Sequence, residues 1–431
     1  MGEFLKTYRG IILLQFILYF VGSILEPLTI PVLAGVYIYW MATEQDRMLL
    51  ITLLVILIMG DSRAYYFSYY KNLRIVCILL VSIYTMTLMF RGKIKFRSLI
   101  LGVVPFFLIA LLGGLRSPSI GVSLSKMISY FLLIFLTLHF FPYLIRKTNG
   151  KVLMDISYLS ALVMILGLIG MIFYPKLVFL IGRYRGMLGN PNGLGIYSTL
   201  TFPLALCLIR LFPHKKSSLR IIIFLIVFSV ILSGSRTALG TIGIFYALYI
   251  FYKGGKTQVF ALWSFILPTT YLVIQSISIE RLVQMVGLGE FLRVESLTTG
   301  TGRFLAWSMG LAEINRNPFI GKGFAYEEIF FHELEDILIA TEHQGGMHNS
   351  FLTFIMNNGY IGFSLFLIFL LILLFKVRAR AFGMPFIIAA LISATFESWL
   401  NSSLNAFTIH FFLVLTLLIE YPRIKAQLSS T

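Results

Sequence analysis

The sequence contains few charged residues and especially few acids. Charged side chains make up 12% of the 431 residues, whereas a soluble domain carries about 25%. Asp and Glu together number 18, against 35 Lys and Arg. So little polar surface cannot coat a water-soluble globule. The basic excess would suggest a nucleic-acid partner in a soluble chain. In a membrane protein it orients the helices instead, so we expect no nucleic-acid partner.

Cysteine is nearly absent as well. Cys77 and Cys207 both lie inside apolar runs, so we expect small buried side chains and no disulfide. The apolar stretch after Arg9 lacks a small-residue cleavage site, so it is predicted to be a first span and not a cleaved signal peptide.

Long apolar runs dominate what remains, because 58% of the residues are hydrophobic. A run of roughly 17–25 apolar residues can cross a membrane as a helix. We predict an all-α, polytopic transmembrane helical bundle of about 12–14 spans. The candidate spans are 10–25, 28–42, 48–60, 73–90, 98–115, 127–145, 152–174, 193–212, 219–233, 237–252, 258–279, 350–375, 384–400 and 404–422.

The basic residues indicate the orientation. With a cytoplasmic N-terminus and every span crossing, each loop assigned to the inside contains at least one Lys or Arg, so we expect both termini in the cytoplasm. The sizeable hydrophilic segment 280–348 then lies outside as one long loop. This predicts helices 1–11 in residues 1–279, an extracytoplasmic loop with its own helices in 280–348, and C-terminal spans in 349–431.

Four short segments are predicted to converge on the outer face, where basic residues oppose the orientation rule and need another reason. They are RYRGMLGNPNGLG at 183–195, LSGSRTALG at 232–240, TGTGRFLAW at 299–307 with NRNPFIGKGF at 315–324, and GGMHNSFLTF at 345–354. In the first segment, Asn192 or Ser198 could cap the helix that follows, whose positive end would face an anion. Arg303 is expected to open a helix with Trp307 on the same face.

These residues suit the chemistry of a phosphoanion. Guanidinium groups bind diphosphate oxygens through two bonds and stay charged at every relevant pH. Histidine titrates near pH 6.5 in water, so His348 could remove a proton from a sugar hydroxyl. We therefore predict His348 as catalytic, and we include Glu397, near the outer end of its span, as a weaker candidate. The predicted substrate-binding residues are Arg183, Arg185, Asn190, Asn192, Arg236, Arg303 and Asn349.

An acidic and histidine-rich stretch raises the question of a metal. Its members are Glu327, Glu328, His332, Glu333, Glu335, Asp336, Glu342 and His343. Glu328 and His332 are four residues apart and could chelate together. The spacing matches no known site, and the solvated face of an amphipathic helix is the favoured interpretation. We predict no metal and no cofactor.

The four segments, in this order, resemble the superfamily of bacterial O-antigen ligases and O-antigen polymerases, which are membrane glycosyltransferases. The resemblance covers roughly residues 183–375, and the chain departs from the family pattern at Lys322 in PFIGKGF. It implies a metal-independent enzyme with a GT-C-like fold in the cytoplasmic (inner) membrane. Such an enzyme acts at the outer face on sugars linked to undecaprenyl diphosphate. Membrane lipids and a chain-length regulator are further candidate partners.

The resulting hypothesis is a polysaccharide polymerase for O-antigen, capsule or exopolysaccharide. In it, Arg185, Arg236 and Arg303 hold the diphosphate of the lipid-linked donor, and His348 activates a hydroxyl of a second lipid-linked repeat unit. Two alternatives stay open. A ligase would move the finished glycan onto lipid A core or protein. A transporter of lipid-linked sugars is disfavoured because the notable residues gather at one rim and not at the midplane.

Overall fold

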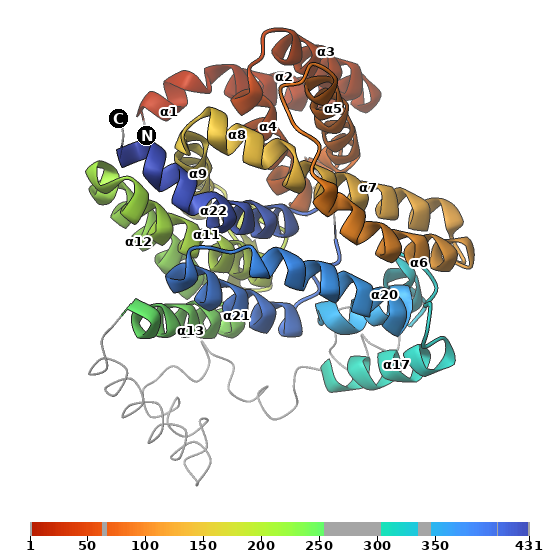
Figure 1. Ribbon diagram of the computed structural model, residues 1–431. Coiled ribbons are helices and arrows are strands. Elements are labelled where there is room, and N and C mark those ends of the chain that lie inside the picture. Colours follow the sequence, from red (N-terminus) through yellow and green to blue (C-terminus); the bar gives the residue numbers. More distant parts are fainter. Residues whose placement is uncertain (1, 63–66, 254–302, 335–345, 403, 430–431) are drawn as a thin grey trace.

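The computed structural model describes residues 2–62, 67–253, 303–334, 346–402 and 404–429 (Figure 1). Helices account for nearly all of its regular structure, as a lipid environment demands. The strands described are the two-residue pair β1 (Phe179–Leu180) and β2 (Arg183–Tyr184), which run antiparallel. The predicted all-α membrane bundle is confirmed. The described helices are α1 (Gly2–Thr7), α2 (Arg9–Ile24), η1 (Glu26–Leu28), α3 (Thr29–Ala42), α4 (Asp46–Asp61), α5 (Tyr70–Phe90), η3 (Ser98–Val103), α6 (Val104–Leu115), α7 (Ile120–Leu138), α8 (Phe140–Lys147), α9 (Lys151–Phe173), α10 (Pro175–Val178), α11 (Pro191–Leu211), η4 (Pro213–Lys215), α12 (Lys216–Ser233), α13 (Arg236–Lys253), α17 (Arg303–Arg316), α18 (Tyr326–Glu333), α20 (Ser350–Phe375), α21 (Arg380–Phe396) and α22 (Ala406–Ser429).

Eight helical stretches in the described part of the chain are long and apolar enough to cross a membrane. They are Tyr70–Phe90, Ser98–Leu115, Ile120–Lys147, Lys151–Phe173, Pro191–Leu211, Pro213–Ser233, Ser350–Phe375 and Ala406–Ser429. The protein is therefore a multi-pass membrane protein. Every predicted span overlaps helical residues except 258–279, which lies outside the described residues. The predicted span 127–145 is not one helix, because the chain turns at His139 between α7 and α8.

The centre of the bundle is built from α11, α22 and the α7–α8 pair. Within α11, 83% of the apolar stretch is buried, and within α22 78%, whereas only 33% of the stretch containing α12 is buried. A helix that is apolar all round and surrounded by other helices belongs to the core, while a half-buried one presents its other side to lipid. The core helices therefore hold the loops and side chains at their ends in fixed positions.

The directions of three neighbouring helices follow from their contacts. A Cβ atom at Gly195 of α11 would lie 2.7 Å from the Cβ of Ala238 in α13. Seven residues further along both helices, the rings of Phe202 and Phe245 lie 5.9 Å apart, so α11 and α13 run parallel. At the far end of α13, Tyr249 stacks on Phe382 near the start of α21 at 4.8 Å. Since α13 packs along α21, these two helices run antiparallel.

Helix α20 breaks at Gly359, and the loop after α17 fills the break. Gly359 has φ +68° and ψ 175°, which interrupts the helical hydrogen bonds. The backbone N–H of Tyr360 donates instead to the oxygen of Pro318 at 2.7 Å, and that of Gly323 donates to the oxygen of Asn357 at the same distance. Irregular backbone inside a membrane protein must find partners within the protein. The loop 317–323 is thereby fixed against α20.

Ion pairs join the helices at the end of the bundle that carries both termini, far from α17 (Figure 1). Asp155 of α9 pairs with Arg47 at 2.5 Å and also accepts a hydrogen bond from Tyr8. Asp46 pairs with Lys147 at 2.6 Å, and Glu420 of α22 binds both Arg97 and Arg146. Three of the 18 acidic residues of the chain are thus used to join helices at this end.

Candidate functional site

The first predicted segment, residues 183–195, is a loop held together by its two arginines. Arg183 donates through Nε and Nη2 to the carbonyl oxygen of the last residue of α12, at 3.2 and 3.0 Å. Arg185 is 5% exposed and donates to the oxygens of Leu177 and Gly189 at 3.2 and 3.1 Å. Both arginines therefore build the loop. The substrate-binding role predicted for them stays a prediction.

Asn190 caps the helix that follows this loop. Its Oδ1 accepts a 2.7 Å hydrogen bond from the backbone N–H of Gly193, the third residue of α11. The prediction that Asn192 or Ser198 caps this helix is wrong, because the helix already begins at Pro191, a residue suited to the first helical position. Asn192 instead accepts from Arg183 Nη2 at 3.4 Å. The backbone N–H groups at the start of α11 point out of the helix, at the end of the bundle where this loop lies.

The second segment packs directly on the first. A Cβ atom at Gly195 would lie 2.6 Å from the hydroxyl of Ser235, so only glycine allows this approach. Arg236 follows at once and opens α13, half-buried. Arg183 is thus bound to the turn between α12 and α13, and Arg236 follows that turn directly.

The third and fourth segments meet at a single carboxylate. Glu397 accepts from Arg303 Nη2 through Oε1 at 3.0 Å, and its Oε2 lies 3.4 Å from His348 Nδ1. The Glu397 side chain is 8% exposed, whereas Arg303 and His348 are 20% and 31% exposed. Arg303 opens α17 as predicted. The carboxylate therefore sits beneath two groups that a ligand from outside can reach.

The chain around this carboxylate is tightly fixed. Asn349 caps α20 by accepting from the backbone N–H groups of Phe351 and Leu352, at 3.0 and 3.1 Å. Its own N–H donates to the hydroxyl of Ser398 at 2.9 Å, and the hydroxyl of Ser350 donates to the backbone oxygen of Glu397 at 2.6 Å. These bonds hold the start of α20 against the end of α21. They also occupy the side-chain oxygen of Asn349, whose predicted substrate contact stays a prediction.

The loop with Arg183 and Arg236 and the cluster of Arg303, Glu397 and His348 lie at the same level of the bundle. We call this end of the bundle the rim. Tyr249 and Phe382 stack on each other and give a common starting level. Arg236 lies thirteen residues before Tyr249 in α13, and Phe396 lies fourteen residues after Phe382 in α21. At 1.5 Å per residue, both paths cover about 20 Å. Because the helices are antiparallel neighbours, Arg236 and the Glu397 carboxylate belong to the same end of the molecule.

Several helix N-termini point to this end. Helices α11 and α13 start there in parallel, and α20 starts beside Glu397. Helix α22 runs parallel to α11, since Tyr197 packs on His410 at 4.8 Å and Gly193 lies against Phe407. Each N-terminus carries a partial positive charge of roughly half a unit. Together with the arginines, they give this rim a potential that favours an anion.

The loop between α17 and α18 is closed by a buried carboxylate. Glu313 pairs with Lys322 at 2.8 Å and accepts from the hydroxyl of Tyr326 at 2.7 Å. Burial works to raise the pKa of Glu313, but the hydrogen bonds from Lys322 and Tyr326 and the charge of Arg316 hold that pKa below its usual range. Lys322, the residue at which the sequence was expected to depart from the family pattern, thus forms an ion pair with Glu313 of α17.

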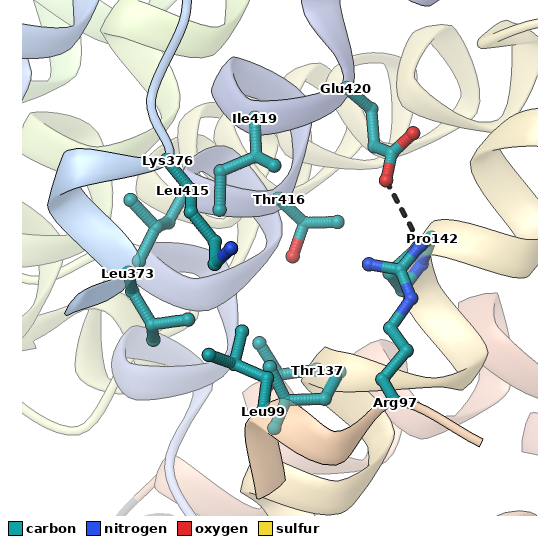
Figure 2. A pocket seen from close by; sticks show the side chains of 11 residues that line it. Arg97, Leu99, Thr137, Pro142, Leu373, Lys376, Leu415, Thr416, Ile419 and Glu420 are labelled. Atoms are coloured by element: carbon teal, nitrogen blue, oxygen red, sulfur yellow. Dashed lines mark hydrogen bonds and ion pairs between the residues drawn. The ribbon is translucent and has the colours of Figure 1, made fainter. Parts of the chain in front are cut away.

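A small cavity lies at the other end of the bundle, beside the ion pairs of Glu420 (Figure 2). Its volume is about 30 Å³, enough for no more than a few water molecules. The ammonium group of Lys376 points into it opposite Arg97, above a floor that includes Leu99 and Leu373. It is too small for a sugar or a lipid headgroup, and it is remote from His348.

One buried acid was assigned wrongly from the sequence. Glu327 was expected on the solvated face of a helix, yet it is 5% exposed, and its Oε1 accepts from the N–H of Met347 at 2.6 Å. Its neighbour Glu328 is the solvated one, with a side chain 66% exposed that pairs with Lys126. Of the other members of the acidic cluster, His332 and Glu333 belong to α18, whereas Glu335, Asp336, Glu342 and His343 lie outside the described residues. The sequence offers one signal that Glu327 is buried and Glu328 is not. Glu327 is next to Tyr326 and four residues before Phe331, and both of these aromatic side chains are buried.

Residues 221–367 match the family model described as O-Antigen ligase. Arg236, Arg303 and His348 lie within the matched range. The resemblance to O-antigen ligases and polymerases is thereby confirmed over this region. No curated protein matches the chain.

Proposed function

We propose that this chain, a membrane protein similar to the O-antigen ligase family over residues 221–367, is a polysaccharide polymerase. It transfers a glycan from undecaprenyl diphosphate to a sugar hydroxyl of a second lipid-linked repeat unit. The observation that carries the proposal is the row of Arg303, Glu397 and His348 at one rim. There His348 can act as a base with Glu397 as its acidic partner, and Arg303 beside them can bind a phosphate.

His348 acts as the base in this proposal. When its Nδ1–H faces Glu397, the lone pair of Nε2 is left to accept a proton, and the carboxylate stabilises the imidazolium that forms. The acceptor oxygen bonds to the anomeric carbon while the bond from that carbon to the diphosphate oxygen breaks. The hydroxyl proton passes to His348, and undecaprenyl diphosphate leaves with the electron pair.

The arginines and helix ends stabilise the leaving group. Negative charge grows on the diphosphate as the glycosidic bond breaks, so fixed cations bind the transition state more tightly than the substrate. Arg303 uses Nη2 for Glu397, and a guanidinium has further N–H donors to offer. Arg236 and the N-terminus of α11 supply positive charge from the other side. The proposal places this rim at the outer face of the cytoplasmic membrane, with both termini in the cytoplasm.

Substitution of His348 tests the catalytic assignment. Purified His348→Ala protein should remain folded and membrane-inserted but should not extend a lipid-linked repeat unit, so a gel should show single units. The wild-type protein should give a ladder of products. Wild-type chain lengths in the variant would refute the role of His348 as the base.

The acceptor decides between polymerase and ligase. Wild-type protein is given the lipid-linked donor with either a second lipid-linked repeat unit or lipid A core. Elongation of the repeat unit supports a polymerase. Transfer confined to lipid A core would establish a ligase with the same site, and binding without any glycosidic product would indicate transport.

A further inference from the structure

The residue before His348 is held on both sides of its backbone by the outer-loop helices. The N–H of Met347 donates to Glu327 Oε1 of α18 at 2.6 Å. Its carbonyl oxygen accepts from Trp307 Nε1 of α17 at 2.8 Å. We call Glu327, Trp307 and Met347 the Met347 clamp. Both helices lie in the segment predicted as the outer loop, so the clamp connects that loop to the base.

The side chain of Met347 completes this attachment. It is 0% exposed, and its Cε would overlap a Cβ placed at Gly310 of α17. Gly310 thus lets the end of the Met347 side chain pack directly against α17. This packing adds to the two backbone hydrogen bonds that hold Met347.

His348 itself adopts a backbone conformation that needs such support. Its φ is +47°, in the left-handed region that residues with a Cβ rarely occupy. Such a conformation persists only where the surroundings enforce it. The clamp fixes the peptide before His348, and the bond from Asn349 N–H to Ser398 fixes the peptide after it. The imidazole is thereby directed at Glu397.

Glu327 is in turn held from below. Its N–H donates to Asn357 Oδ1 of α20 at 2.9 Å, in the turn that precedes the break at Gly359. Burial raises the pKa of Glu327, against the lowering effect of the bond from Met347. An acceptor that is buried and fixed at its own backbone can define the position of its donor within a few tenths of an ångström.

We propose that Glu327 and Trp307 are positioning residues that align His348 with Glu397 through the backbone of Met347. The proposal rests on the function proposed above, in which His348 is the base. It predicts that the outer loop controls the rate of the chemical step without touching the reacting atoms. Misplacement of a base by about 1 Å is enough to lower a rate on the order of 100-fold.

The test measures single-turnover glycan transfer as a function of pH for four variants of the full chain. Glu327→Leu removes the acceptor and should lower the rate roughly 10- to 100-fold. Its acid limb should move to lower pH, because an imidazole displaced from Glu397 loses the charge that favours its protonated form. Glu327→Gln keeps an acceptor oxygen and should stay within about threefold of wild type. Trp307→Phe keeps the ring but removes the N–H donor, and should shift the acid limb in the same direction as Glu327→Leu.

Glu328→Gln is the matched control, since it changes the exposed neighbour on the same helix and should behave as wild type. The double variant Glu327→Leu/Trp307→Phe should lose less than the product of the single losses, because both act on one peptide. A wild-type rate and pH profile in folded Glu327→Leu would overturn the proposal. If His348→Ala is fully active, the proposed function fails first. If His348→Ala is inactive and the clamp variants are normal, only this inference fails.

Discussion

At the scale of single residues, the notable feature is one carboxylate shared by a cation and an imidazole. Glu397 touches both Arg303 and His348 from the end of a different helix. A buried carboxylate of this kind orients the imidazole and stabilises its charged form. The hydroxyl of Ser350 donates to the backbone oxygen of Glu397, and that of Ser398 accepts from the N–H of Asn349, so the backbones of Glu397 and His348 are tied together.

Glu397→Gln should slow transfer while leaving the protein folded. The amide can still accept from Arg303, but it no longer stabilises an imidazolium, so we expect a single-turnover rate lower by about 100-fold. Glu420→Gln is a useful comparison, because that carboxylate is also buried between two arginines, Arg97 and Arg146. It should lower the melting temperature and leave the rate of transfer per folded molecule unchanged. An unaltered rate in Glu397→Gln would remove Glu397 from the mechanism.

Arg303, Glu397 and His348 were singled out in the sequence and lie together in the structure, but the contacts of the other predicted residues were not foreseen. The arginines of the segments predicted to lie outside, and His348 among them, could be identified because ionisable side chains in and beside membrane spans are rare and often functional. That Arg183 and Arg185 bind backbone carbonyls could not be predicted, because loop carbonyls leave no mark on the sequence. The burial of Glu327 escaped for a related reason: two adjacent glutamates on a short helix differ only in which side meets α20.

At the scale of elements, the fold depends on the break in α20 and the loop that fills it. Apolar run lengths predicted this helix correctly, since lipid leaves the backbone little choice but a helix. The break at Gly359 was not predicted, because a glycine inside an apolar run is compatible with a straight span. Its partner, the loop after α17, is distant in sequence from the break. Only tertiary structure brings them together.

Gly359→Ala should destabilise the protein strongly. Its φ of +68° disfavours a Cβ, and the new atom would overlap the carbonyl group of Phe319. Loss of the loop contact and the backbone strain together should lower the free energy of unfolding by about 2–4 kcal/mol, measured by thermal unfolding in detergent. Gly243→Ala is the control, since a Cβ atom at that position of α13 would meet nothing within 4 Å. That change should be neutral or stabilising by up to about 1 kcal/mol. Equal melting temperatures for the two variants would contradict the role assigned to the break.

At the scale of the whole molecule, the two ends of the bundle carry opposite arrangements of charge. The end with the termini pairs its basic residues with buried carboxylates such as Asp155 and Glu420. At the rim, helix N-termini and arginines gather around the carboxylate of Glu397, and Asp61 at the end of α4 accepts a hydrogen bond from the backbone N–H of Gly189. The positive charge of these arginines and helix ends favours an anion, such as the lipid-linked diphosphate of the proposed function.

This asymmetry leads to a prediction about orientation in the membrane. Ser308 on α17 and Lys93 near the opposite end are both exposed, and the native Cys77 and Cys207 are buried, so a single introduced cysteine should dominate labelling. If the rim faces outward as proposed, Ser308→Cys should react with a membrane-impermeant maleimide on intact spheroplasts. Lys93→Cys, at the end that carries the termini, should then react only after the membrane is opened. The reverse pattern would place the rim in the cytoplasm, and no donor presented at the outer face could then reach His348.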